Sequence, residues 1–449
     1  MLYAGIDLGT THTKAILCDQ EGNLLWEQKL RVHTHHPQQG WHEQNPLEIW
    51  QNLKTLLDNL SQLVAAKSET CRICFSSAMH SIMSVDENGL PQSPLITWAD
   101  LRSNQEVKSL KLSTDVLKLY NQTGTPIHPM SPLCKIVWFR NKYKDLFDKT
   151  FKWVSAKDYI WWQLTGKWQA DHSVASASGL FNIHERSWHA GSLELAGINE
   201  NQLPAPVPVS YRTIPSALPP GCGNWAQLPE LQIGGSDGFL ANLGSHAVDK
   251  GVMALTIGTS GAVRVLINKP VEFTAISLFQ YAADDGRWLL GGAVNNGGNL
   301  LSWFSEVFLQ GAQTPEAVMQ YWLDRAALVP PGCDGLQCTP WVFGERAPVW
   351  DADARASFTG IHAGHHKEHF LRAILEGVAG NIKKILTEME KQGVEVERIN
   401  ASGGFIASKL WVNIMEEGLG KKIQITNEGD ASARGAVVLA MKKIKWMKK

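Results

Sequence analysis

The sequence has few cysteines, no long apolar run and no excess of charge of either sign. Its 7 cysteines are an odd and sparse set among 449 residues, which argues against a disulfide framework. No apolar stretch approaches the ~20 residues that cross a bilayer, and residues 1–7 lack the basic residues of a secretory signal. Lys+Arg 42 against Asp+Glu 43 leaves no basic excess for a nucleic-acid backbone. We therefore expect a cytoplasmic globular protein with no nucleic-acid and no membrane partner.

Two common site signatures are also missing. Cys71 and Cys74 have the spacing of a metal or redox motif, but they stand in a strand-like run and no second pair follows at zinc-ribbon distance. We interpret both as strand cysteines. No Gly-x-Gly-x-x-Gly follows a strand and opens a helix, which argues against a single dinucleotide-binding sheet.

The chain begins with strand-like segments joined by tight turns. Residues 3–8 and 14–18 alternate like strands around the polar turn 9–13, and the turn 19–22 leads into a third strand. Asn45 and Pro46 then predict the start of a helix that runs to about residue 67.

The same order recurs in the second half. Residues 252–257 and 262–267 are apolar and flank the turn Gly258-Thr259-Ser260-Gly261. A hairpin through 284–286, a long amphipathic helix that stops at Gly393 and a strand–helix–strand–helix tail from residue 398 follow. We therefore predict two related α/β domains, residues 1–245 and 246–449, with a ligand in the cleft between them.

The two Gly-Thr turns are candidates for phosphate binding. Glycine lets the backbone approach a ligand closely, so N–H groups and threonine hydroxyls can surround phosphate oxygens. Two such loops at the openings of two similar halves can hold one nucleotide from opposite sides. Asp7, just before the first loop, would then face the phosphates, where a carboxylate is repelled unless a cation intervenes, and it predicts Mg²⁺.

A third candidate is the segment Gly234-Gly235-Ser236-Asp237-Gly238. It follows a short strand and opens a helix, so Asp237 can reach into the cleft. An aspartate at such a position is often only a helix cap. Its place between the two Gly-Thr loops in sequence favours a role as catalytic base.

Six motifs occur in one order along the chain: Gly5-Ile6-Asp7-Leu8-Gly9-Thr10-Thr11, Met79-His80-Ser81, Trp98-Ala99-Asp100-Leu101-Arg102, Gly235-Ser236-Asp237, Leu255-Thr256-Ile257-Gly258-Thr259-Ser260 and Ser402-Gly403-Gly404. In these motifs the sequence closely resembles the FGGY carbohydrate kinases of the actin-like ATPase superfamily. The resemblance covers nearly the whole chain.

The resemblance implies two ribonuclease-H-like domains, with ATP and Mg²⁺ in the cleft and phosphorylation of a sugar or polyol hydroxyl. It implies Asp237 as the base and Asp7 as the carboxylate on the metal side. The nucleotide contacts that it implies are Thr10, Thr11, Gly258, Thr259, Asn295, Gly403, Gly404 and Ser408.

The acceptor is suggested by two segments. Met79-His80-Ser81 and the proline-rich stretch 125–135 are similar to the gluconate kinase branch of the family. This similarity implies transfer to D-gluconate, giving 6-phospho-D-gluconate, with a sugar pocket that includes Met79, His80, Trp98, Met130, Lys135 and Asp237. A cation must meet the carboxylate, and we favour Lys135 or His80 over Arg102, which Asp100 can occupy.

Three rival interpretations remain at this stage. The first is another kinase of the family, with xylulose or another pentulose or polyol as acceptor. The second, from another class, is an actin/Hsp70-like ATPase without sugar kinase activity, although the chain shows no peptide-binding appendage. The third is an inactive sugar sensor, against which the two retained carboxylates argue. The sequence leaves the oligomeric state open, and a homodimer is one expectation.

Overall fold

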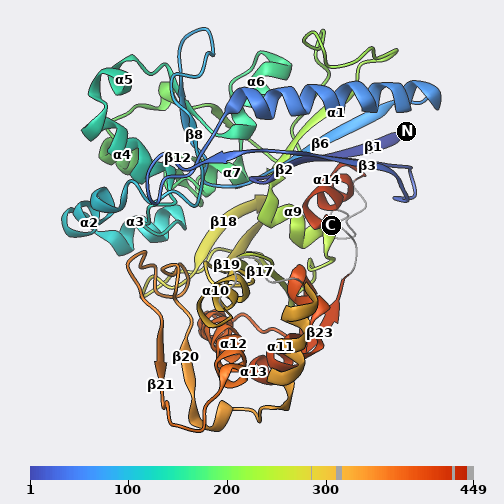
Figure 1. Cartoon of the computed structure of the whole chain (residues 1–449). Coiled ribbons are helices and arrows are strands. Elements are labelled where there is room, and N and C mark those ends of the chain that lie inside the picture. Colours follow the sequence, from blue (N-terminus) through green and yellow to red (C-terminus); the bar gives the residue numbers. More distant parts are fainter. Residues whose placement is uncertain (285, 310–315, 427–429, 442–449) are drawn as a thin grey trace.

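The computed structural model describes residues 1–284, 286–309, 316–426 and 430–441. The chain forms two lobes, each with a six-stranded mixed sheet. In Figure 1 the first half of the chain, blue to green, forms the upper lobe, and most of the second half, yellow to red, forms the lower lobe. The predicted fold class of two α/β domains is confirmed.

The sheet of the upper lobe has the strand order β14-β15-β6-β1-β2-β3. Strands β1, β2 and β3 form an antiparallel meander, while β6 runs parallel to β1 and β15 runs parallel to β6. The strands are β1 (Leu2–Leu8), β2 (His12–Cys18), β3 (Leu24–Arg31), β6 (Cys71–Ser77), β14 (Arg212–Thr213) and β15 (Glu230–Ser236).

The sheet of the lower lobe repeats this plan, with the order β18-β19-β17-β16-β22-β23. Strands β16, β17 and β19 form the meander, and β22 and β23 continue the sheet in parallel. The strands are β16 (Val252–Ile257), β17 (Gly261–Ile267), β18 (Phe279–Asp284), β19 (Arg287–Val294), β22 (Arg398–Ser402) and β23 (Lys422–Ile425). Residue 285, in the predicted hairpin turn, lies outside the described residues.

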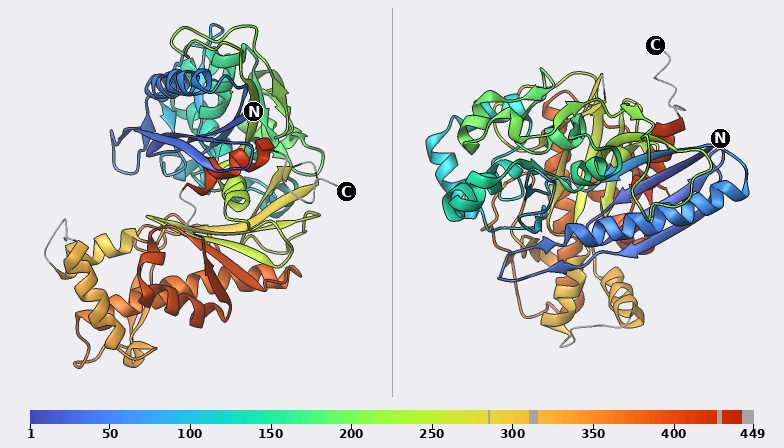
Figure 2. Two further views of the ribbon diagram at one scale, coloured as in Figure 1. Left: turned by 90° about the vertical axis from the view of Figure 1, so that its right-hand side faces the viewer. Right: turned by 90° about the horizontal axis from the view of Figure 1, so that it is seen from above.

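Long helices cover the sheets as the apolar spacing predicts. Helix α1 (Pro46–Ala66) begins where the Asn45 side chain accepts a hydrogen bond from the backbone N–H of Leu47. Its buried face includes Ile49, Leu53, Leu56 and Leu60. In the lower lobe, α12 (Lys367–Lys391) ends just before Gly393, which has a φ of 78°. Figure 2 shows α1, the long blue helix, from two further directions.

Shorter elements complete the two lobes. In the upper lobe they are β4 (Thr34–His35), β5 (Glu43–Gln44), β7 (Met83–Val85), β8 (Leu95–Ile96), α2 (Asn104–Ser113), α3 (Val116–Thr123), α4 (Pro132–Lys142), α5 (Lys144–Lys149), β9 (Lys152–Val154), α6 (Ala156–Thr165), β10 (Gln169–Asp171), α7 (His172–Ser176), β11 (Phe181–Asn182), β12 (Ser187–Trp188), α8 (Ala190–Ala196), β13 (Ala205–Val207) and α9 (Asp237–Gly244). In the lower lobe they are α10 (Asn299–Phe308), α11 (Glu316–Leu328), β20 (Gln337–Thr339), β21 (Ser357–Thr359) and α13 (Lys409–Leu419).

The last described helix, α14 (Ala431–Met441), returns to the upper lobe. It packs against α9, β1 and β6, and Figure 1 shows it in red beside the blue strands. The contact with α9 is very close: a Cβ added at Gly435 would lie 1.8 Å from the carbonyl oxygen of Leu240. Only glycine permits this approach. The division of the chain into two domains at residue 245 stays a prediction. Helix α14 lies after that point in the sequence but packs on the upper lobe.

Two further expectations can be compared with the fold. Cys71 and Cys74 lie on β6 and are buried free thiols, which confirms their interpretation as strand cysteines. None of the helices in the described part of the chain is long and apolar enough to span a membrane.

Candidate active site

A cavity of about 250 Å³ lies where the two lobes meet. Both lobes line it. The upper lobe contributes Thr10, Met79, His80, Trp98, Met130 and Asp237, and the lower lobe contributes Thr256, Ser260, Gly261, Ala262, Arg264, Phe279, Tyr281, Ala293, Arg346 and Trp350. The cavity therefore brings together most of the residues that the sequence assigned to the sugar pocket.

Asp237 enters the cavity from the start of α9. Strand β15 has an irregularity just before it, where Gly234 has a φ of 69° and an added Cβ would lie 1.9 Å from the carbonyl oxygen of Phe75. The backbone N–H of Gly238 donates to Asp237 Oδ1 at 2.7 Å. Burial raises the pKa of Asp237, although the positive charge of Arg264 works against this shift. A carboxyl group with a raised pKa is a better proton acceptor than an exposed aspartate.

A buried network holds the turn that carries Asp237. Lys157 Nζ donates to the carbonyl oxygen of Gly235 at 2.8 Å and pairs with Asp171 Oδ2 at 2.6 Å. Ser173 Oγ donates to Asp171 Oδ1 at 2.6 Å and accepts from the backbone N–H of Ser236 at 2.7 Å. The two residues before Asp237 are thus fixed by side chains from α6, β10 and α7. The sequence interpretation missed this network because its members are far apart in the chain.

Asp7 lies at the end of β1, where its Oδ1 accepts a hydrogen bond from Ser76 Oγ at 2.6 Å. Burial and the neighbouring carboxylates of Asp430 and Asp237 together raise the pKa of Asp7 to about 7, while the Ser76 hydrogen bond and the charge of Lys14 oppose this shift. Asp430 itself forms an ion pair with Lys14. The sequence interpretation missed Asp430, which precedes the first residue of α14.

The carboxylates around Asp7 fit a magnesium ion that keeps most of its ligands as water or phosphate oxygens. Among the described residues no three His, Cys, Asp or Glu side chains are grouped so that they alone could hold a metal ion. Mg²⁺ prefers hard oxygen ligands and usually binds through one or two carboxylates plus substrate phosphates. The carboxylates of Asp430 and Asp237 repel that of Asp7, and a bound cation would relieve this repulsion.

The first Gly-Thr loop joins β1 to β2. Gly9 N–H donates to the carbonyl oxygen of His12 at 3.1 Å, which closes the turn. Thr10 lines the cavity, whereas Thr11 is exposed and is absent from the cavity lining.

The second Gly-Thr loop joins β16 to β17 and lies on another pocket. This pocket has a volume of about 510 Å³, and Gly258, Thr259, Gly404 and Ser408 are among its lining residues. The N–H of Gly298 donates to the carbonyl oxygen of Gly258 at 2.7 Å, so the start of α10 supports the loop. The structure therefore brings four of the predicted nucleotide residues together on the lower lobe.

Two predicted nucleotide residues lie beside this pocket without lining it. Gly403 has a φ of 96° and turns the chain after β22. Asn295 is turned toward the protein: its Nδ2 donates to the carbonyl oxygen of Phe343 at 3.1 Å and its backbone N–H donates to Glu345 Oε1 at 2.6 Å.

His80 is a neutral member of the cavity. Its Nδ1 lies 2.6 Å from the carbonyl oxygen of Ala177, an acceptor only, so Nδ1 carries the proton. Burial, together with the charge of the nearby Lys135, lowers the pKa of His80 to about 3. His80 can therefore exchange hydrogen bonds with a hydroxyl group, but it brings no positive charge at neutral pH.

Lys135 is buried in α4 and does not line the cavity. Its Nζ donates to three carbonyl oxygens, those of His80, Thr97 and Met130, at 2.8, 2.7 and 2.7 Å. These carbonyls belong to cavity-lining residues or their direct neighbours. Lys135 therefore ties together the loops around the cavity.

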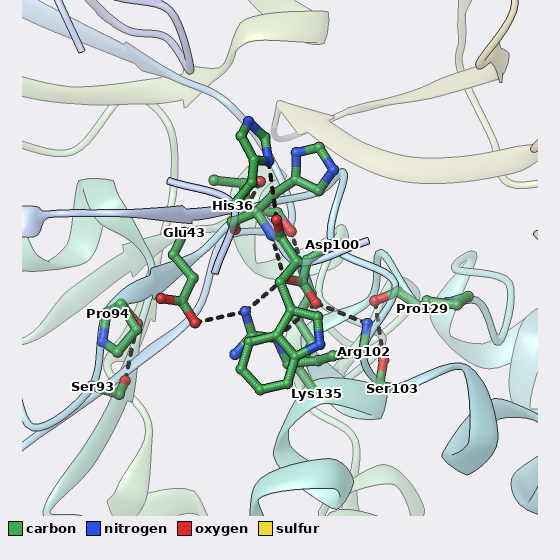
Figure 3. A network of polar contacts seen from close by, with 12 residues as sticks. His36, Glu43, Ser93, Pro94, Asp100, Arg102, Ser103, Pro129 and Lys135 are labelled. Carbon is green, nitrogen blue, oxygen red and sulfur yellow. Dashed lines mark hydrogen bonds and ion pairs between the residues drawn. The ribbon is translucent and has the colours of Figure 1, made fainter. Parts of the chain in front are cut away.

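The guanidinium group of Arg102 is also bound by partners within the protein. Its Nε and Nη2 donate to the two oxygens of Asp100 at 2.8 and 2.7 Å, and Nη2 also reaches Glu43 Oε1 at 2.8 Å. Its guanidinium stacks on Trp41 at 3.7 Å from the ring centre. Figure 3 shows Arg102 with Asp100 and Glu43, and with Lys135 nearby. The expectation that Asp100 occupies Arg102 is met.

Two arginines of the cavity were missed by the sequence interpretation. Arg264 stands on β17 between Val263 and Val265, and a charged residue inside an apolar strand is a signal that could have been used. Arg346 lies in the loop after β20 and is 8% exposed.

Comparison with known proteins now identifies the class. The model of the FGGY family of carbohydrate kinases, N-terminal domain, matches residues 2–244, and the C-terminal domain model of the same family matches residues 253–444. The chain belongs to the FGGY family of carbohydrate kinases and is an ATP-dependent kinase that acts on a small-molecule sugar or sugar acid. This result removes the actin/Hsp70-like ATPase without kinase activity as a rival.

Individual relatives fall into two groups. The chain is 37% identical to a gluconokinase of Bacillus subtilis, over 97% of this chain and 86% of the relative. It is 30% identical to a xylulose kinase of Lactococcus lactis, over 89% of this chain and 79% of the relative. The crystal structure of a gluconate kinase from Lactobacillus acidophilus superposes with a TM-score of 0.90 at 30% identity, covering 99% of this chain and 90% of the other.

Proposed function

We propose that this protein is a gluconate kinase, which transfers the γ-phosphoryl group of ATP to the terminal hydroxyl of D-gluconate and forms 6-phospho-D-gluconate. The observation that carries the proposal is the cavity between the lobes, where the carboxylate of Asp237 shares one small space with two arginines, Arg264 and Arg346. The higher identity to gluconokinases than to xylulose kinases supports the choice of acceptor. A pentulose such as xylulose is the second candidate, because xylulose kinases also match along most of the chain.

In the proposed reaction Asp237 acts as the general base. Its carboxylate accepts the proton of the primary hydroxyl while the hydroxyl oxygen attacks the γ-phosphorus. The bond between this phosphorus and the oxygen bridging to the β-phosphate breaks, and ADP leaves with that oxygen. The network from Lys157 to Ser236 keeps the carboxylate in place during the transfer. Met79, His80, Trp98 and Met130 form the wall against which the sugar chain lies.

The phosphates of ATP are proposed to lie between the two Gly-Thr loops, near Thr10 on one side and Gly258 and Thr259 on the other. Gly404 and Ser408 then lie on the nucleoside side of the lower-lobe pocket. Mg²⁺ held on the Asp7 side, when bound, would neutralise charge on the phosphates. Asp7 itself does not line the acceptor cavity, and its side chain is anchored by Ser76.

The acceptor is tested with a coupled assay for ADP release, with D-gluconate, D-xylulose, D-ribulose and glycerol at equal concentration. We expect gluconate to give the highest kcat/KM, and identification of the product as the 6-phosphate completes the test. A preference for a neutral ketose would overturn the gluconate assignment and leave the kinase activity intact. A homodimer and a cytoplasmic location stay predictions, the first to be tested by mass measurement in solution.

The role of Asp237 is tested with Asp237→Asn. Since general-base catalysis contributes about 10²–10⁴-fold, kcat should fall by that factor while ATP binding is retained. Near-normal turnover in this variant would leave Asp237 only a structural role at the start of α9.

A further inference from the structure

The charges around the acceptor cavity do not balance. Of its lining residues, Asp237 is the one carboxylate, and Arg264 and Arg346 are two cations. His80 adds no charge at neutral pH, because burial lowers its pKa to about 3. The described lining therefore carries an excess of one positive charge. A buried unpaired cation is costly, so a site that keeps one is built for an anion.

Arg264 is the cation that belongs with Asp237. A Cβ added at Gly238, the residue after Asp237, would lie 3.2 Å from Arg264 Nε, so the guanidinium faces the start of α9. Its positive charge lowers the pKa of Asp237 against the effect of burial. Among the described residues no carboxylate lies within 4.0 Å of the Arg264 nitrogens, and its Nη1 is buried without a hydrogen-bond partner, so Arg264 offsets Asp237 by its charge and not through an ion pair. The charge of Arg346 is left over.

Arg346 has unused donors toward the cavity. A guanidinium offers five N–H donors, and within the described residues the side chain makes one hydrogen bond, from Nη2 to the carbonyl oxygen of Val294 at 3.0 Å. Its Nε is buried and has no partner. The indole of Trp98 lies 4.7 Å from the guanidinium carbon, which fixes the position of the group. Arg346 is thus held in place while most of its donors stay available.

The neighbouring carboxylate of Glu345 does not satisfy Arg346. Glu345 Oε1 accepts from the backbone N–H groups of Asn295 and Arg346, at 2.6 and 2.9 Å. Its Oε2 accepts from the side-chain amides of Asn296 and Asn381, at 3.1 and 3.2 Å. In the described part of the chain no carboxylate comes within 4.0 Å of the Arg346 guanidinium nitrogens. Glu345 is committed to holding the loop that presents Arg346.

We propose that the guanidinium of Arg346 binds the carboxylate of the acceptor and that this contact makes the enzyme prefer a sugar acid to a neutral sugar. The inference rests on the proposed function and assigns the cation that it requires. Arginine suits the task because its planar fork matches a carboxylate in two parallel hydrogen bonds. The carboxylate then lies at the Trp98 wall, and the hydroxyl to be phosphorylated lies at Asp237. This separation keeps the two negative groups of the reaction apart.

The test compares D-gluconate with D-gluconamide, which has the same carbon chain and a neutral amide in place of the carboxylate. D-glucitol, with a hydroxymethyl group there, is a second neutral acceptor. We expect the unmodified enzyme to favour gluconate over gluconamide by at least about tenfold in kcat/KM, the range of a charge-assisted contact. A smaller preference overturns the role of the carboxylate contact without any variant being needed.

Arg346→Met should lower kcat/KM for gluconate by about ten- to a hundredfold and change gluconamide use by less than about threefold. Arg346→Gln is a second neutral variant in case methionine does not fold, with folding checked by circular dichroism and ATP binding. Arg264→Met is the matched control: it should lower the use of both acceptors together, so the gluconate-to-gluconamide ratio is kept. An unchanged ratio in either folded Arg346 variant overturns the proposal.

The two proposals fail in different ways. If the unmodified enzyme prefers xylulose to gluconate, the gluconate assignment falls and the Arg346 contact falls with it. If it prefers gluconate but loses that preference in Arg264→Met and keeps it in Arg346→Met, the function stands and the carboxylate contact belongs to Arg264.

Discussion

Replacing Lys135 with methionine separates a supporting role from direct contact with the substrate. The ammonium group is buried in α4, and it donates to the carbonyl oxygens of His80, Thr97 and Met130. Methionine has a similar length and leaves little empty space, but it offers no donor. The three loops that carry these carbonyls would then lose their common anchor.

The cost to stability can be worked out from these contacts. The carbonyl oxygen of Thr97 keeps the backbone N–H of Asp100 at 3.3 Å as a donor. Each of the other two buried carbonyls left without a donor costs about 1–3 kcal/mol, which gives about 2–6 kcal/mol for the pair. The variant recovers part of this because a buried ammonium is itself poorly solvated, and burial lowers the pKa of Lys135 to about 7. We expect a net loss of about 2–4 kcal/mol in the free energy of unfolding.

Kinetics give the sharper readout. Because Lys135 does not line the cavity, Lys135→Met should raise KM for gluconate and gluconamide together, by about tenfold, and keep their ratio. Lys152→Met is a matched control, since Lys152 Nζ also donates to two carbonyl oxygens, of Asn201 and Leu203, away from the cavity. It should change stability and leave KM as it is. Selective loss of gluconate use in Lys135→Met would show that Lys135 meets the carboxylate and would refute this reasoning.

Three further predictions concern the metal side, the base and the pH dependence. Asp7→Ala should raise the Mg²⁺ concentration needed for half-maximal rate and lower turnover with little change in gluconate KM; an unchanged Mg²⁺ titration contradicts its role. Ser173→Ala removes the acceptor of the Ser236 N–H, so kcat should fall about tenfold with every acceptor while KM stays nearly constant. The pKa of His80 is about 3 in the folded protein and 6.5 in the unfolded chain. Unfolding therefore takes up a proton below pH 6.5, and the free energy of unfolding decreases as the pH is lowered. At pH 5 this amounts to about 2 kcal/mol, and a urea titration of His80→Asn should lack this part of the loss.

The backbone plan could be predicted because its signals are local. Turns rich in glycine and threonine interrupt alternating runs at residues 9–13 and 258–261, and each run is short enough to be a strand. Asn45 caps α1, as its place before Pro46 predicts. That Asp237, Met79, His80, Trp98 and Met130 share one cavity was predicted only by the family resemblance, because they are widely separated in the chain.

The charges of the site could not be assigned from sequence alone. Lys135 stands in a helix whose residues 132–139 are all buried, so no periodic pattern shows where its ammonium group ends. The burial of such a helix is equally consistent with a lysine that lines a pocket and with one that donates to three carbonyl oxygens. Arg346 gave no signal in its loop, because its availability depends on where the oxygens of Glu345 are bound. Whether a cation of the site is available to a ligand depends on the partners of all its neighbours.

The return of α14 to the upper lobe has a consequence for the order of folding during synthesis. Chains generally fold domain by domain as they leave the ribosome, beginning with the N-terminal part. Here the face of β1 and β6 stays bare until α14, made after the entire lower lobe, arrives to cover it. Asp430, which pairs with Lys14 on the hairpin of β1 and β2, arrives with it. The nascent upper lobe therefore lacks this cover until the lower lobe has been made, and the surroundings of Asp7 are completed last.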